Sequence, residues 1–198
     1  MMKENKILAK VAKIIRVVTV PPVMVTTLII TLSVSDVNVF TSTAQSVISV
    51  VLLGLLPVLA YPVSYAVPAL RKKGRDAQRD LAIYFSVVGY TAAVIYGHVA
   101  HVSSGLLMIY YGYFISVILI ALAKLLKVKA SGHACSVSGP IAYIAYFMGL
   151  GGIISGVALW GLILFASLYL KRHTLSEFLA GTAICILAFA SSWLIFGI

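Results

Sequence analysis

Residues 105–126 read GLLMIYYGYFISVILIALAKLL, an apolar run whose one charged residue, Lys124, comes near its end. The run has 22 residues. As an α-helix it would be about 33 Å long, and the hydrocarbon core of a bilayer is about 30 Å thick. Continuous rather than alternating apolar sequence favours a helix over a strand of a β-barrel. The run therefore predicts a transmembrane α-helix.

Six further apolar runs surround this one, separated by charged or turn residues. The predicted spans are 11–34, 44–70, 81–102, 105–126, 132–149, 153–171 and 174–197. The chain is 62% hydrophobic and 10% charged, with a mean hydropathy of +1.08. A soluble domain is about 45–50% apolar and 25% charged, so a soluble enzyme, a disordered chain and a secreted disulfide scaffold are excluded. The sequence predicts an all-α, polytopic transmembrane helix bundle of about seven spans, with six as the alternative, forming one integral membrane domain over 1–198. Pro21-Pro22 would kink the first span.

The chain has 15 Lys and Arg against 5 Asp and Glu, and every basic residue falls on one side of the predicted bundle. With seven spans, that side holds the N-terminus and the second, fourth and sixth connections. The basic residues are Lys3, Lys6, Lys10, Lys13, Arg16, Arg71, Lys72, Lys73, Arg75, Arg79, Lys124, Lys127, Lys129, Lys171 and Arg172. Connections rich in Lys and Arg stay in the cytoplasm. We therefore expect an integral protein of a bacterial-type cell membrane, with the N-terminus inside and Ile198 outside.

Three polar clusters lie on this basic side, at 72–80, 131–133 and 171–177. Two spans separate each cluster from the next. The chain therefore returns to the same face each time, and the three clusters can meet there.

The residue types in these clusters suit phosphoryl transfer. His173 and Glu177 are four apart at the start of a span, so they share one helix face. A carboxylate there can bond one imidazole nitrogen and leave the other as a nucleophile. His133 could transfer a proton near neutral pH, and Lys72 and Arg79 are cations suited to phosphoryl oxygens.

Ser131 and Gly132 precede His133 at the start of the fifth span. The start of a helix presents free N–H groups and the positive end of the helix dipole, which favour an anion. Ser131 adds a hydroxyl group, and Gly132 allows the backbone to approach a ligand closely.

Each cluster also has a simpler explanation when it is taken alone. The basic residues of 71–79 could serve only to set the topology. The 131–133 cluster could be a helix start with an incidental histidine. His173 and Glu177 could cap a helix at the membrane interface.

In their order and spacing, the clusters resemble the motifs of the type 2 phosphatidic acid phosphatase superfamily of membrane lipid phosphatases. The pattern of that family is Lys-x6-Arg-Pro, then Pro-Ser-Gly-His, then Ser-Arg-x5-His-x3-Asp. The matching residues are Lys72 and Arg79, Ser131-Gly132-His133, and His173. The resemblance covers residues 72–177.

Five positions depart from the family pattern. Asp80 and Ala130 each stand where the family has proline, and Glu177 replaces the final aspartate at the same spacing. Ala166-Ser167 stands where Ser-Arg is expected, so the arginine that holds the phosphate is missing. Arg172 or Lys171 is the predicted substitute.

The resemblance implies a metal-independent phosphatase without a cofactor. His173 would attack phosphorus and form a phosphohistidine, Glu177 would orient it, and His133 would protonate the leaving group. The phosphate would be held by Lys72, Arg79, Ser131, Gly132 and Arg172. The implied partner is a phosphorylated lipid of the phosphatidate, phosphatidylglycerophosphate or polyprenyl phosphate type, with no nucleic acid and no obligate protein partner.

Two alternatives stay open at this point. The missing arginine also fits a catalytically inactive relative that binds or transports a phosphorylated lipid. The motifs could also be accidental in an unrelated transporter or structural membrane protein.

Overall fold

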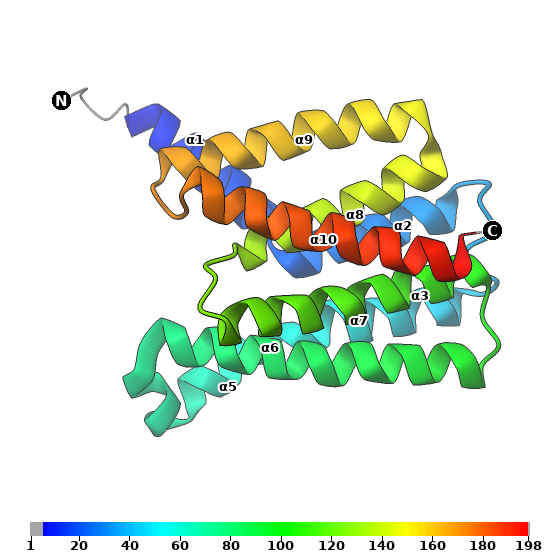
Figure 1. Cartoon of the computed structure of the whole chain (residues 1–198), viewed down its shortest axis with the longest axis horizontal. Coiled ribbons are helices and arrows are strands. Elements are labelled where there is room, and N and C mark those ends of the chain that lie inside the picture. The colour runs from blue at the N-terminus through cyan, green and yellow to red at the C-terminus, as the bar shows by residue number, and fades with distance from the viewer. Residues whose placement is uncertain (1–5, 198) are drawn as a thin grey trace.

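The computed structural model describes residues 6–197, with the side chain of Arg75 left aside; Lys3 and Ile198 lie outside the described residues. The described chain is helical and contains no strand (Figure 1). Its helices are α1 (Lys6–Val18), α2 (Pro21–Val34), α3 (Thr43–Ser49), the π-helical η1 (Val50–Leu55), α4 (Leu56–Val58), α5 (Ala60–Ala66), α6 (Pro68–Val99), α7 (Ser104–Leu125), α8 (Gly132–Met148), α9 (Leu150–Tyr169) and α10 (Leu175–Phe196). The all-α prediction is confirmed.

Several of these helices can cross a membrane. Within the described residues, five helical segments are long and apolar enough: Thr43–Ala66, Asp76–Val99, Ser104–Leu125, Leu150–Tyr169 and Leu175–Phe196. The pair α1 and α2 adds a sixth if the two are one broken span. The predicted run 132–149 forms α8, whose 17 residues lie at the short end of the range for a span.

Prolines and a glycine break the first half of the chain. The axes of α1 and α2 differ by 60°, and Pro21 and Pro22 begin α2, so the predicted kink is confirmed. Gly74 has φ 62° and ψ −134°, which interrupts α6 six residues after its start at Pro68. A non-glycine residue rarely adopts this conformation. The long helix that reaches across the bundle therefore begins after Gly74.

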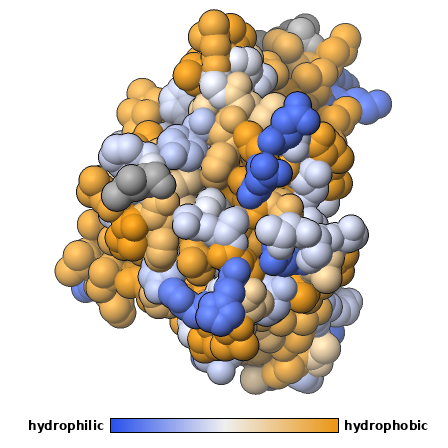
Figure 2. All heavy atoms as spheres, turned by 90° about the vertical axis from the view of Figure 1, so that its right-hand side faces the viewer, coloured by the Kyte–Doolittle hydropathy of each residue, from blue (hydrophilic) through white to orange (hydrophobic). Residues whose placement is uncertain are grey.

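The basic connections lie together at one end of the bundle. Figure 1 shows α1, the start of α6, the 126–131 connection and the 170–174 connection at the left. The connections after α2, α6 and α8 lie at the right, with the end of α10. Figure 2 looks onto this second end and shows hydrophilic atoms gathered across part of it, with hydrophobic atoms around the rim.

Large apolar side chains cover the outside of the bundle. Val157 is 64% exposed and Leu194 is 71% exposed, on helices that pass the test for a span. A monomeric soluble protein rarely exposes so much continuous apolar surface. The lateral surface is therefore suited to lipid, as an integral membrane protein requires.

The interior combines close packing with polar bonds between helices. α8 is the central element and contacts α2, α9 and α10, while α1 packs on α9. The buried Tyr143 hydroxyl of α8 donates to the Met108 carbonyl of α7 at 3.0 Å. Tyr110 of α7 and Ser49 of α3 join their hydroxyls at 2.7 Å. Such bonds hold helices together where both sides of each helix are apolar.

Three helices end in the same motif. A residue with positive φ follows the last turn of each: His101 after α6, Lys127 after α7 and Lys171 after α9. In α7, the Lys127 amide donates to the Lys124 carbonyl at 3.0 Å and the Val128 amide to the Ala123 carbonyl at 2.8 Å. This is a Schellman C-cap, a position at which glycine is the usual residue.

We expect Lys127→Gly to stabilise the protein relative to Lys127→Ala by about 1 kcal/mol, because only glycine adopts positive φ without a steric cost. The two variants carry the same charge and differ by one methyl group, so comparing them isolates the cost of positive φ at position 127. Unfolding of detergent-solubilised protein by heat would measure it. Equal stability of the two variants would contradict the assignment of this cap.

Candidate active site

A cavity of about 650 Å³ opens among α2, α6, α7, α8 and α10 on the side of the basic connections. Arg16, Arg79, His133 and His173 line one part of it. The remainder is lined mostly by apolar and aromatic side chains, among them Pro21, Pro57, Tyr90, Tyr113, Tyr143 and Phe189. The wall that α8 contributes runs from Gly132 to Tyr143, which is about 16 Å along the helix. The cavity thus joins a small charged part to a deep apolar part.

His173 is held by the first turn of α10. Its Nδ1 lies 3.2 Å from Oε2 of Glu177, one turn further along. Glu177 also accepts from the Thr174 amide at 3.3 Å, and its own amide donates to the Thr174 hydroxyl at 3.2 Å. This reciprocal capping box fixes the carboxylate, and the carboxylate in turn orients the imidazole. Glu177 therefore has both roles that the sequence suggested, as a helix cap and as the partner of a histidine.

With Nδ1–H donated to Glu177, the other ring nitrogen of His173, Nε2, carries the lone pair. Burial lowers the pKa of His173, and the positive charges of Arg16 and Arg79 lower it further, while the hydrogen bond and charge of Glu177 oppose the shift. The net result is a neutral imidazole at neutral pH. A neutral imidazole is the form that acts as a nucleophile.

The starts of α8 and α10 are joined through their backbones. The Ser131 amide donates to the Glu177 carbonyl at 2.9 Å. Gly181, one turn further along α10, lies so close to the Ser131 carbonyl that a Cβ atom there would collide with it. Ser131 is fully buried, and its hydroxyl accepts from the Ala134 amide at 3.2 Å as the N-cap of α8. Its hydroxyl is used inside the fold, and it is not one of the described residues that line the cavity.

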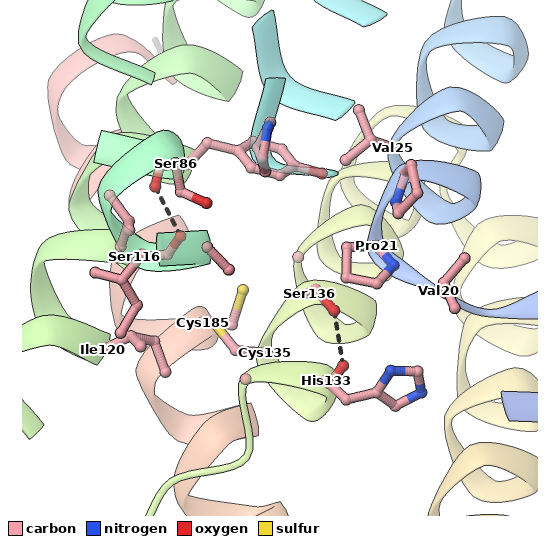
Figure 3. A pocket seen from close by; sticks show the side chains of 18 of the residues that line it. Val20, Pro21, Val25, Ser86, Ser116, Ile120, His133, Cys135, Ser136 and Cys185 are labelled. Carbon is pink, nitrogen blue, oxygen red and sulfur yellow. Dashed lines mark hydrogen bonds between the residues drawn. The ribbon is translucent and has the colours of Figure 1, made fainter. Parts of the chain in front are cut away.

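His133 projects from the first turn of α8 into the cavity (Figure 3). Its Nε2 lies 3.4 Å from the hydroxyl of Thr19, at the bend between α1 and α2. That hydroxyl donates to the Ile15 carbonyl at 2.7 Å, so it is placed to accept a hydrogen bond from the Nε2–H of His133. Gly132 lines the cavity beside His133, with open space where a side chain would be.

The predicted phosphate-binding cations divide into two groups. Arg79 lines the cavity, although its side chain is also exposed. Lys72 and Arg172 are exposed and are not among the described lining residues, and Lys72 lies on the far side of the Gly74 break from Arg79. Asp80, where the family that the motifs resemble has proline, forms an ion pair with Lys124 at the end of α7.

Arg16 is the residue that the sequence analysis did not assign to the site. Its Nη1 donates to the Ser167 hydroxyl at 3.0 Å, across 151 residues of sequence. Ser167 stands at the position where the family that the motifs resemble has the arginine missing from this chain. The one signal in the sequence was a cation within the apolar stretch Ile14–Val18 at the start of a span, where charges are costly and often functional.

The end of α9 brings Ser167 next to His173. Lys171 has φ 50° and forms a Schellman C-cap, in which the Arg172 amide donates to the Ser167 carbonyl at 3.1 Å. The chain reverses there, so His173 returns toward the last turn of α9 while the Arg172 side chain stays exposed. Arg16 and His173 therefore line the same cavity, although they come from opposite ends of the chain.

No protein-family model, curated protein or solved structure matches the chain.

We expect His173 to titrate below pH 6.5, the ordinary histidine value, because burial and the nearby arginines disfavour its charged form. The unfolded chain would take up this proton first, so the free energy of unfolding should fall as the pH drops from 6.5 through the folded-state pKa. NMR titration of histidine-labelled protein would report the midpoint.

Glu177→Gln removes the charge that opposes the shift, so it should move the midpoint of His173 lower still. His98, at the other end of the bundle, serves as the internal reference. A His173 midpoint at or above 6.5 in the wild type would contradict the described environment.

Proposed function

We propose that this protein is an integral membrane lipid phosphatase that hydrolyses a phosphomonoester or pyrophosphate of a lipid through a phosphohistidine intermediate. The observation that carries the proposal is the cavity in which two histidines and two arginines adjoin a deep apolar compartment. A phosphorylated lipid has the matching division, with an anionic head and an apolar tail. The motif resemblance to the type 2 phosphatidic acid phosphatase superfamily supports the same assignment.

The first chemical step would be attack by Nε2 of His173 on phosphorus. The N–P bond forms while the bond from phosphorus to the lipid oxygen breaks. The departing alkoxide takes a proton from His133, which a bound phosphate would keep in its protonated form. Glu177, hydrogen-bonded to Nδ1, stabilises the positive charge that develops on the ring of His173.

The second step would be hydrolysis of the phosphohistidine. His133, now neutral, accepts a proton from a water molecule as the water oxygen attacks phosphorus. The N–P bond breaks, its electron pair returns to Nε2 of His173, and inorganic phosphate leaves. Positive groups around the cavity stabilise the equatorial oxygens through both steps, which is the main requirement of phosphoryl transfer.

The substrate class follows from the shape and lining of the cavity. About 16 Å of α8 separates the charged end from Tyr143, and the residues between include Cys135 and Gly139. A free sugar phosphate would leave this apolar wall in contact with water. A lipid of the phosphatidate, phosphatidylglycerophosphate or polyprenyl phosphate type would cover it.

We expect detergent-purified protein to release phosphate from short-chain phosphatidate or a polyprenyl diphosphate in the presence of EDTA. His173→Ala should lower the rate by on the order of 10³-fold or more, because the nucleophile is lost. His98→Ala is the matched control, since it removes a histidine at the opposite end of the bundle and should retain the wild-type rate.

The results of this assay distinguish a histidine phosphatase from an inactive lipid-binding relative. Turnover that requires EDTA-removable metal, or that survives in His173→Ala, would refute the histidine mechanism. An absence of turnover with every lipid tried, in protein that still binds a lipid phosphate, would favour the alternative of an inactive relative that binds or transports such lipids.

The seven-span topology and the cytoplasmic site are part of the proposal. Their support is that the basic connections lie at one end of the bundle and the other connections lie at the opposite end (Figure 1). Under this scheme α8 is a short span, and α1 and α2 together make one crossing.

We expect a reporter fused after Ile198 to be exposed outside the cell, whereas one inserted at 127–130 should stay in the cytoplasm. Enzymatic reporters active on only one side of the membrane would measure both. A cytoplasmic C-terminal reporter would contradict an odd number of spans.

A further inference from the structure

Arg16 reaches the cavity because the chain bends directly after it. α1 packs against α9, and α2 turns away by 60° to pack against α8. The bend contains Thr19, whose hydroxyl contacts His133, and it ends at Pro21, which also lines the cavity. Arg16 is thus half-buried between the end of α9 and the two histidines, whereas Lys10 and Lys13 on the same helix are exposed.

A transferring phosphoryl group needs fixed positive charge around it. Among the described residues that line the cavity, Arg16 and Arg79 are the ones with a permanent positive charge. The other basic candidates, Lys72 and Arg172, are exposed and are not among those lining residues. A site that relied on Arg79 alone would leave much of the phosphate charge uncompensated in an apolar cavity, which is costly.

The contacts of Arg16 suit it to bind phosphate. Its Nη1 is anchored by the Ser167 hydroxyl at 3.0 Å, at the end of α9 that folds back to His173. Ser167 is fully buried, so its hydroxyl is a fixed acceptor that orients the guanidinium. A guanidinium carries five N–H donors in a planar fork that matches phosphate oxygens. The charge of Arg16 also acts on His173, whose pKa it lowers.

We propose that Arg16, carried by the N-terminal helix α1, is a phosphate-binding residue of the site, with Ser167 as its anchor. The inference rests on the proposed function, and it names a ligand of the phosphate that lies outside the motif region 72–177. It makes α1 part of the active site, in addition to any role of its charges in topology. The chain would thereby supply from a different helix the cation that position 167 lacks.

The first experiment compares Arg16→Gln with Lys13→Gln, which removes the same charge from an exposed position one turn earlier. We expect Arg16→Gln to lower kcat/KM for a short-chain lipid phosphate by roughly 100-fold or more, as loss of one charge-stabilising group does. Lys13→Gln should stay within about threefold of the wild type, since exposed charges contribute little. Arg16→Lys should lie between them, because it keeps the charge and loses the fork.

The second experiment moves the guanidinium. Ser167→Arg placed in the Arg16→Ala background would return a guanidinium to the space that Arg16 vacates. We expect this double variant to exceed Arg16→Ala in kcat/KM by at least about tenfold, corresponding to one restored charge-assisted contact. Rescue of this kind depends on the charge in the site, so a merely structural role of Arg16 in seating α1 would not produce it.

A binding measurement separates this inference from the proposed activity. Inorganic phosphate should raise the thermal midpoint of the wild type and of Lys13→Gln but not that of Arg16→Gln. This pattern without turnover of any lipid would refute the phosphatase and retain Arg16 as a phosphate ligand. Turnover and phosphate protection that both persist in Arg16→Gln would overturn the inference and leave the phosphatase standing. A wild type that shows neither lipid turnover nor protection by phosphate would overturn both the phosphatase and the role of Arg16.

Discussion

The hydrogen bond from the Ser131 amide to the Glu177 carbonyl joins the starts of α8 and α10, and the geometry of the site depends on it. It places His133 and His173, which are 40 residues apart in the sequence, on adjoining walls of one cavity. The contact is possible because Gly181 has no side chain to hold the two helices apart. Both helices also have their own N-caps, so neither helix needs this bond to satisfy the backbone groups of its first turn. The bond is therefore available to fix the relation between the helices.

Electrostatics within the cavity follow from this arrangement. Two arginines face two histidines, and one carboxylate stands behind His173. The arginines and burial keep His173 neutral, while Glu177 limits that shift and orients the ring. An anion entering the cavity would compensate the positive charges of Arg16 and Arg79, which disfavour a protonated His173. A phosphate group carries the matching negative charge, which is the basis of the proposed function.

The candidate site was partly predictable from spacing. The spacing placed His173 beside Glu177, but the predicted shared helix face is wrong, because His173 precedes Thr174, the N-cap of α10. The 3.2 Å contact arises because the capping box holds Glu177 at the start of the helix. The grouping of polar clusters at one end of the bundle followed from counting spans. The side-chain positions of Ser131, Lys72 and Arg172 could not be predicted in this way, because the burial and direction of a side chain depend on the residues packed around it in the fold. Ser131 is turned inward as a helix cap, and the Schellman turn after α9 leaves the Arg172 side chain outside.

The sequence by itself determined the class of fold and the end of the bundle at which the polar clusters lie. Apolar runs long enough to cross a bilayer must be helical there, since lipid cannot satisfy backbone hydrogen bonds, and the basic residues mark one side. Only the tertiary structure decided which cations meet the histidines. The distance between Arg16 and Ser167 depends on a 60° bend at two prolines and on the packing of α1 against α9, and neither leaves a periodic pattern along the chain. Local periodicity records which face of a helix is apolar, whereas contacts between residues 151 positions apart arise only when the helices pack.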